Sequence, residues 1–184
     1  MNRFLKLVQQ KGFFKEHRRV LVALSGGKDS MTLFNWLYAY RKELEIELFT
    51  AHVNYGLRDV ADWEEEQLKK KMEELQVELE VAHYDSGEKF SEEAGRLMRY
   101  EFFRQVMEDK KCTALVTAHH KGDQVETVLM REITGRRLRH LTGIPERQVF
   151  GSGELIRPLL TFNKADFDAE EYFEDVTNAG TDYL

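Results

Sequence analysis

An apolar run in the first part of the chain ends in a turn of small residues that leads directly into a helix pattern. The run covers residues 20–24, the turn reads Ser-Gly-Gly-Lys-Asp-Ser over residues 25–30, and apolar positions continue to residue 37. Adjacent glycines let a backbone bend tightly and direct its N–H groups outward without Cβ clashes. A helix start adds free N–H donors and a partial positive charge. The sequence therefore predicts a buried strand, a tight turn and a helix start that together bind an anion such as phosphate.

The side chains of the turn suit a phosphate and a metal ion. The hydroxyls of Ser25 and Ser30 can add hydrogen bonds, and Lys28 supplies a compact positive charge. Asp29 offers a hard oxygen ligand of the kind that Mg²⁺ prefers. An ordinary glycine turn between a strand and a helix is the alternative interpretation.

Two better-known phosphate loops do not fit this turn. The pattern G-x-x-x-x-G-K-S/T requires a glycine five residues before Gly27, where Val22 stands, and a hydroxyl residue where Asp29 stands. The dinucleotide pattern G-x-G-x-x-G fails because Gly26 and Gly27 are adjacent and the next glycine is Gly56. A different class of nucleotide site is therefore indicated.

Composition places broad limits on the chain. Its 184 residues suffice for one domain, or for one domain and the start of another, and 42% of them are hydrophobic. No apolar run has membrane-spanning length, and the N-terminus lacks the pattern of a signal peptide. Cys112 is the only cysteine, so the chain cannot form an internal disulfide. We expect a cytoplasmic protein, and a net charge of −6 restricts any RNA contact to a local surface.

Strand patterns alternate with helix patterns along the chain. The predicted strands are 20–24, 46–54, 77–83 and 113–118, and the predicted helices are 1–14, 31–37, 60–76, 91–109 and 123–131, with Ser91 as an N-cap. This order predicts an α/β fold, a Rossmann-like, doubly wound parallel sheet with helices on both faces. Ligands of such sheets bind beyond the carboxyl ends of the strands. One site is therefore expected near Ser25, residues 52–58 and residues 119–126.

The turn resembles the S-G-G-x-D-S signature of the PP-loop ATP pyrophosphatases, and further segments narrow the resemblance to the tRNA(Ile)-lysidine synthetases. Residues 52–58, His-Val-Asn-Tyr-Gly-Leu-Arg, resemble that family's H-V-N-H-G-L-R, and residues 118–127 resemble its A-H-H-x-D-D-Q-x-E-T. Residues 92–100 resemble E-x-x-A-R-x-x-R-Y, with Gly95 in place of the alanine. Residues 141–144, 156–160 and 175–178 also match, so the resemblance runs from about residue 20 to residue 178.

The resemblance implies an activity. Members of the family bind ATP and Mg²⁺ and adenylate the 2-position oxygen of the wobble cytidine in an isoleucine tRNA with a CAU anticodon. Free L-lysine then displaces AMP and forms lysidine, and pyrophosphate is the other product. Adenylation creates a good leaving group, which divides a difficult displacement into two easier steps. The amides of Gly26 and Gly27, with Lys28 and Mg²⁺, are suited to stabilise the charge that develops on pyrophosphate.

The resemblance also implies roles for individual residues. It assigns catalysis to Lys28, Asp29 and Asp123, with the two aspartates as Mg²⁺ ligands. For ATP it indicates Ala23, Ser25, Gly26, Gly27, Lys28, Asp29, Ser30, Val53 and His119. Candidates for tRNA or lysine are Arg58, Arg96, Arg99, His120 and Glu126 in or next to the matching segments, and Arg136, Arg137 and Arg139 because they lie in an arginine-rich window.

Simpler roles remain open for several of these residues. Ala23 and Val53 are equally suited to core packing, and Arg96 and Arg99 to a surface ion pair with Glu92. One of the histidines can be structural. The arginine-rich window 131–147 can be a solvated basic loop instead of an RNA-binding surface.

Two features depart from the family's pattern. Gly122 stands where the family has the first of two aspartates, which removes a carboxylate next to Asp123. The sequence stops soon after residue 178, so we expect a single catalytic domain over residues 1–184, with a core at about 19–160. Residues 161–184 would begin the connection to tRNA-binding domains that this chain lacks.

Three other functions fit the fold. A tRNA thiolase shares the loop, but its usual chemistry needs paired cysteines, and this chain has only Cys112. An amidating synthetase would need an ammonia source. An ATP-binding module without turnover is the third alternative. A homodimer is compatible with the sequence.

Overall fold

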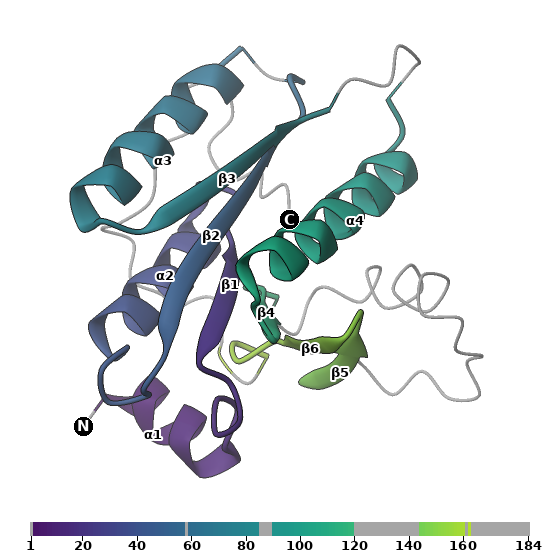
Figure 1. Ribbon diagram of the computed structural model, residues 1–184. Helices are drawn as coiled ribbons and strands as arrows, with labels where there is room; N and C mark the ends of the chain where they lie inside the picture. The colour runs from purple at the N-terminus through teal and green to yellow at the C-terminus, as the bar shows by residue number, and fades with distance from the viewer. Residues whose placement is uncertain (1, 58, 85–89, 120–143, 161, 163–184) are drawn as a thin grey trace.

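Six strands form one sheet in the order β3-β2-β1-β4-β6-β5 in the computed structural model (Figure 1). The structure describes residues 2–57, 59–84, 90–119, 144–160 and 162. The strands are β1 (Arg19–Ala23), β2 (Glu47–Asn54), β3 (Glu78–His83), β4 (Ala114–Val116), β5 (Arg147–Phe150) and β6 (Gly153–Ile156). The helices are α1 (Arg3–Lys11), α2 (Lys28–Ala39), α3 (Ala61–Leu75) and α4 (Glu92–Lys110). The predicted α/β architecture with a mainly parallel sheet is confirmed.

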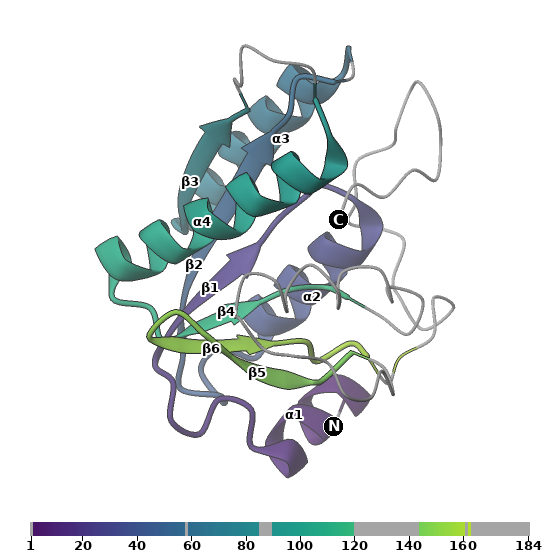
Figure 2. The same ribbon diagram turned by 90° about the vertical axis from the view of Figure 1, so that its right-hand side faces the viewer.

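The two faces of the sheet bury different helices. Alternate residues of β1 point to opposite faces, as a strand requires. Val20 and Val22 join a core under α1, α2 and α3, whereas Leu21 and Ala23 join a second core under α4. Figures 1 and 2 show α4 on the opposite side of the sheet from α2. Helices therefore cover both faces, as the strand–helix alternation predicts.

Local capping determines where two of the helices begin and one ends. The Asn2 side chain accepts a hydrogen bond of 2.7 Å from the Phe4 amide at the start of α1. Gly12 ends that helix in the left-handed conformation, with φ of 63°. Ser91 accepts a hydrogen bond of 3.1 Å from the Ala94 amide, which confirms the N-cap predicted for α4.

The hairpin formed by β5 and β6 was not predicted from the sequence. β6 pairs in parallel with β4, and β5 pairs antiparallel with β6 at the edge of the sheet. Each strand has only four residues, and Gly151 turns the chain between them with φ of 55°. Such short segments carry too little periodicity to be recognised. The predicted helix 123–131 lies outside the described residues.

The order of the strands reverses at β1. The chain proceeds from β1 to β2 to β3 toward one edge, and then returns through α4 to place β4 on the other side of β1. β1 pairs in parallel with both β2 and β4, so the three strands end at the same edge of the sheet. Open α/β sheets bind ligands at such a reversal, beyond the carboxyl ends of the strands. This topology places the candidate site where β1 and β4 end.

Cys112 lies just before β4, at the amino ends of the parallel strands and thus opposite the candidate site. It belongs to the core under α4. Its side chain is buried, and burial raises the pKa of the thiol to about 11.

None of the helices among the described residues is long and apolar enough to cross a membrane.

We expect Cys112 to react slowly with iodoacetamide in the native protein. At about pH 8 the raised pKa reduces the thiolate fraction by on the order of 10²-fold relative to an exposed cysteine. Mass spectrometry of native protein and of protein in urea measures the two alkylation rates. Equal rates would contradict a buried thiol.

Candidate active site

The loop between β1 and α2 is held by its own serines. The Ser25 amide donates a hydrogen bond of 3.0 Å to Ser30 Oγ, and the Gly27 amide donates one of 3.1 Å to Ser25 Oγ. The two hydroxyl oxygens lie 3.0 Å apart. The Met31 amide donates to the Gly27 carbonyl at 3.1 Å and continues the helix. Both serines predicted to bind phosphate therefore also shape the loop.

The glycines give this loop a backbone that other residues adopt poorly. Gly26 is buried and has φ of 88°, in the left-handed region that favours glycine. Gly27 is the N-cap of α2, and no side-chain cap of that helix occurs among the described residues. The first turn of a helix leaves its N–H groups without helical partners. The start of α2 is therefore suited to an anion, as the sequence predicts.

Asp29 and Lys28 begin α2. The Asp29 side chain is only 4% exposed, although it lies in the first turn next to the loop. A helix N-terminus stabilises a negative charge placed in its first turn. Lys28 is half-buried at the preceding position. The helix start thus combines a cation for phosphate with a carboxylate that suits Mg²⁺.

The end of β4 brings His119 to the same edge of the sheet. Val22 of β1 is paired with Val116 of β4, so residues 117–119 continue from β4 on the side of the sheet where residues 23–25 end β1 and begin the loop. His119 is 1% exposed, and its Nδ1 atom lies 2.6 Å from Thr117 Oγ1. His119 therefore lies just after the carboxyl end of β4, at the edge of the sheet where the loop begins.

Two side chains of β2 that were not assigned a role also lie at this edge. His52 Nδ1 is 2.7 Å from the carbonyl oxygen of Leu24, the residue before the loop. Asn54 accepts a hydrogen bond of 2.9 Å from the Gly56 amide and donates one of 2.9 Å to Asp62 of α3. Their place in the H-V-N motif was the signal available in the sequence, but their partners depend on the sheet.

Burial lowers the pKa of His52 below its ordinary value, and the Leu24 hydrogen bond and the Glu65 charge offset only part of this effect. Between about pH 7 and pH 5.5 the unfolded chain therefore takes up a proton at His52 that the folded protein resists. The free energy of unfolding should consequently fall as the pH falls.

Urea unfolding across this pH range tests the expectation. The His52→Asn variant should lose less stability than the unmodified chain as the pH falls. The Thr50→Val variant keeps His52 and should retain the full pH dependence. The same slope for His52→Asn and for the unmodified chain would contradict the assignment to His52.

The α4 side of the site contains a buried arginine and a required glycine. Arg99 is 5% exposed, and its Nη1 atom donates a hydrogen bond of 3.4 Å to the Tyr55 hydroxyl. A Cβ atom on Gly95 would lie 2.8 Å from the ring of Phe90. Real Cβ contacts are not that short, so the glycine accommodates the ring in place of the family's alanine. Arg96 is half-buried on the same helix.

Comparison of the sequence with models of known protein families identifies the family of this chain. The PP-loop domain family matches residues 1–184, which is the whole chain. The chain belongs to the PP-loop domain family.

This PP-loop domain is similar to proteins named tRNA(Ile)-lysidine synthase. It is 52% identical over 181 residues to the one from Streptococcus gordonii, covering 98% of this chain and 42% of that protein. It is 51% identical over 182 residues to the one from Lactococcus lactis, covering 99% of this chain and 43% of that protein. The chain thus spans less than half the length of these relatives.

Solved structures share the fold at low sequence identity. A U34-tRNA thiolase from Methanococcus maripaludis has a TM-score of 0.59 and 22% identity, covering 85% of this chain and 58% of that one. An ammonia-dependent NAD synthetase from Campylobacter jejuni has a TM-score of 0.55 and 14% identity, covering 90% of this chain and 70% of that one. At these identities the likeness concerns the fold alone.

Two predicted adenine contacts lie in the core of the PP-loop domain. Ala23 and Val53 are 1% and 7% exposed and pack in the cluster under α4. Their side chains therefore have the core-packing role that the sequence left open.

The last arginine of the predicted RNA-binding window has a structural partner. Arg147 donates to Glu154 from Nε at 3.1 Å and from Nη2 at 2.8 Å, across the β5–β6 hairpin. The same bonds lower the pKa of the Glu154 carboxyl. Several other predicted site residues lie outside the described residues: Arg58, His120, Asp123, Glu126, Arg136, Arg137 and Arg139, together with Gly122.

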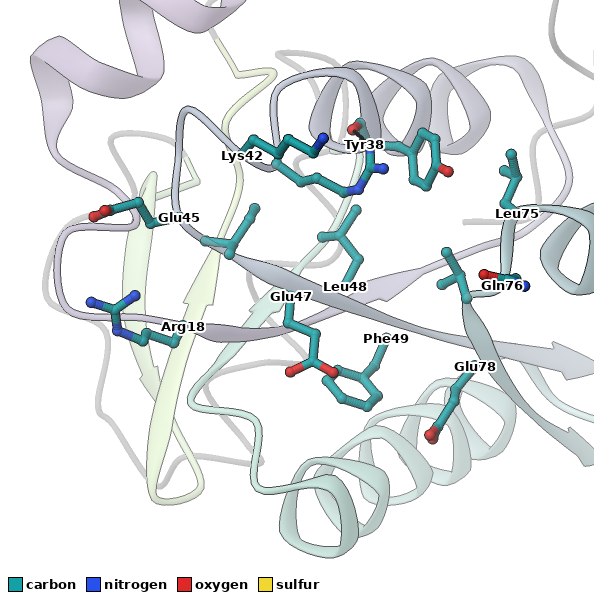
Figure 3. A pocket seen from close by; sticks show the side chains of 13 residues that line it. Arg18, Tyr38, Lys42, Glu45, Glu47, Leu48, Phe49, Leu75, Gln76 and Glu78 are labelled. Atoms are coloured by element: carbon teal, nitrogen blue, oxygen red, sulfur yellow. Dashed lines mark hydrogen bonds between the residues drawn. The ribbon is translucent and has the colours of Figure 1, made fainter.

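An open groove of about 700 Å³ lies at the opposite edge of the sheet, where β2 and β3 begin (Figure 3). Leu48 and Leu75 contribute apolar surface, and Lys42 and Glu47 are among its charged residues. Glu47 is paired with Arg19 at 3.0 Å. The loop residues do not line this groove, so it is not the candidate active site.

Proposed function

We propose that the chain is the ATP-activating domain of a tRNA(Ile)-lysidine synthase. The observation that carries the proposal is the identity of about one residue in two with proteins of that name, over nearly the whole chain. The loop geometry supports it, because the signature residues occupy a strand end and a helix start. The family match supports ATP as the nucleotide.

The proposed reaction has two steps. The 2-position oxygen of the wobble cytidine attacks the α-phosphorus of ATP, and the bond to the bridging oxygen breaks to release pyrophosphate. The lysine amine then forms a bond to C2 of the base and loses a proton, while the C2–O bond breaks and AMP leaves. Adenylation is needed because a carbonyl oxygen is a poor leaving group and AMP is a good one.

The loop residues would stabilise the leaving pyrophosphate. The amides of the first turn of α2 and the Lys28 ammonium would face negative charge that grows as the bond breaks. Because these donors are held by the fold before ATP binds, they would need little reorganisation during the reaction. His119, at the end of β4, would contact a phosphate or the ribose.

Mg²⁺ would be held by carboxylates next to the loop together with the phosphates of ATP. Mg²⁺ binds through one or two carboxylates together with substrate phosphates, and no group of three or more acidic, histidine or cysteine ligands occurs among the described residues. The buried Asp29 carboxylate next to the loop would be the first ligand and Asp123 the second. The ion, when bound, would neutralise phosphate charge.

Binding of tRNA and lysine is the less constrained part of the proposal. Arg96 and Arg99 lie in the N-terminal half of α4, the half nearer the carboxyl edge of the sheet, and would meet substrate phosphate. Arg58, Arg136, Arg137 and Arg139 would bind the anticodon loop, with affinity that falls as salt rises. His120 and Glu126 would lie near the lysine.

The described residues give no support to the thiolase alternative. The single thiol, Cys112, is buried in the core before β4, at the edge of the sheet opposite the loop. Burial raises its pKa, which makes it a poor nucleophile and a poor metal ligand.

Incubation with Mg²⁺-ATP, labelled lysine and an unmodified isoleucine tRNA bearing a CAU anticodon tests the proposal. Formation of AMP and pyrophosphate with lysine in the RNA would establish it. ATP binding without lysine transfer would favour an ATP-binding module, and a longer chain with the relatives' C-terminal region would then be tested. The Gly122→Asp variant separates the effect of that position from the effect of length. Failure to bind ATP would refute the proposal.

A further inference from the structure

A buried histidine of β2 holds the residue that precedes the nucleotide loop. β1 ends at Ala23, whereas its neighbour β2 continues to Asn54. The Leu24 amide still donates to the Ala51 carbonyl at 2.8 Å, and the Leu24 carbonyl lies 2.7 Å from His52 Nδ1. A carbonyl only accepts hydrogen bonds, so Nδ1 carries the hydrogen and donates it. Leu24, the first residue after β1, is therefore bonded to β2 through both its amide and its carbonyl, and His52 supplies the second of these bonds.

This contact acts directly on the loop because Leu24 and Ser25 share a peptide plane. The carbonyl of Leu24 and the amide of Ser25 belong to one planar group, so fixing one fixes the other. The Ser25 amide donates to Ser30 Oγ at 3.0 Å, and Ser25 Oγ accepts from the Gly27 amide at 3.1 Å. The His52 hydrogen bond therefore orients the first link in the set of bonds that shapes the loop.

His52 is buried near charged groups of α3 and β3. Its side chain is 5% exposed. Glu65 of α3 and His83 of β3 both act on its charge, and the two are themselves paired at 2.6 Å. Lys69 Nζ also lies 3.3 Å from Glu65. A buried ring has little room to move, so His52 is suited to fix the Leu24 carbonyl.

We propose that His52 is a positioning residue for nucleotide binding, because its Nδ1–H group fixes the Leu24–Ser25 peptide plane and so prepares the loop before ATP arrives. This inference rests on the proposed function. A ligand binds more weakly when the competent conformation is only partly populated. Loss of the His52 donor should therefore weaken ATP binding without removing any group that contacts ATP.

A second residue of the same strand provides a matched control. Thr50 lies on the same face of β2, is 1% exposed, and donates from its hydroxyl to the Glu78 carbonyl at 2.7 Å. Like His52, it joins a buried side chain to the backbone of a neighbouring strand. The hydrogen bond of Thr50 is made to β3, and it does not involve the loop. The Thr50→Val variant should therefore lose stability without losing affinity for ATP.

The test compares four variants by their dissociation constants for Mg²⁺-ATP, measured by calorimetry, and by their stability in urea. The variant His52→Phe lacks the donor and should bind ATP roughly tenfold more weakly, since it leaves the Leu24 carbonyl without this partner. His52→Gln should behave similarly, because its amide reaches past the Nδ1 position. His52→Asn places an amide near Nδ1 and should stay within about threefold of the unmodified affinity. Thr50→Val should bind ATP normally.

Several results would overturn the inference. Normal ATP affinity in both His52→Phe and His52→Gln would do so, as would His52→Asn binding as weakly as His52→Phe. If His52→Phe does not fold, His52→Gln and His52→Asn carry the comparison. If the unmodified chain does not bind ATP, the proposed function fails. Hydrogen exchange at the Ser25 amide then decides the role of His52, because that amide should exchange faster in His52→Gln than in Thr50→Val.

Discussion

The Asp29→Asn variant is expected to release pyrophosphate from ATP at least on the order of 10²-fold more slowly than the unmodified chain. Asp29 combines a buried position, a place in the first turn of α2 and an immediate connection to the phosphate loop. Asparagine keeps the size of the side chain but removes the charge that would hold Mg²⁺. Pyrophosphate release in the presence of tRNA and lysine, at several Mg²⁺ concentrations, measures the effect.

A matched control distinguishes this role from a general effect of charge at a helix start. Glu93 is an exposed carboxylate in the first turn of α4. The Glu93→Gln variant removes an equivalent charge from another helix N-terminus and should keep full activity. If Asp29→Asn retained activity while folding normally, Asp29 would not be a metal ligand.

The Gly26→Ala variant should lose most of its affinity for ATP. Gly26 has φ of 88°, and an L-residue in the left-handed region is destabilised by about 1–2 kcal/mol. The loop would relieve this strain by moving away from the conformation that suits phosphate. An increase of at least about tenfold in the dissociation constant for Mg²⁺-ATP is expected.

Gly12 offers the control for this substitution. It ends α1 with φ of 63°, and an added Cβ would meet only the Lys15 side chain, at 3.5 Å. The Gly12→Ala variant should therefore carry a similar backbone penalty, seen as a lower free energy of unfolding, with unchanged ATP binding. Comparable loss of ATP affinity in both variants would indicate that global stability, and not loop geometry, governs binding.

Local sequence patterns were sufficient to predict much of this fold. The apolar run 20–24, the glycines after it and the helical spacing beyond residue 30 each depend on neighbours in sequence. The same is true of the Ser91 cap and of the long helix α4. Strand–helix alternation then restricted the architecture to a parallel sheet, because parallel strands need crossover connections. The short β5 and β6 hairpin was missed, since four-residue strands carry little pattern.

The candidate site was predicted in part. The loop and His119 lie at one edge of the sheet, as expected, because β1 and β4 are adjacent and parallel. The side chains of Ala23 and Val53, in contrast, are part of the core under α4. Residue type and position near a strand end could not decide between these roles, since the face that each side chain occupies depends on sheet packing.

The sequence by itself determined the strand–loop–helix unit, the alternation of strands and helices from β1 to β4 and the family, because each depends on short-range patterns. Only the tertiary structure decided which distant groups meet. The hydrogen bond from His52 to Leu24 joins residues 28 positions apart, and a Cβ atom on Gly95 would lie 3.2 Å from the ring of Tyr55, a residue of the segment after β2. Such contacts depend on strand register and on how α4 crosses the sheet, and these are properties of the whole packed domain that no local stretch of sequence contains.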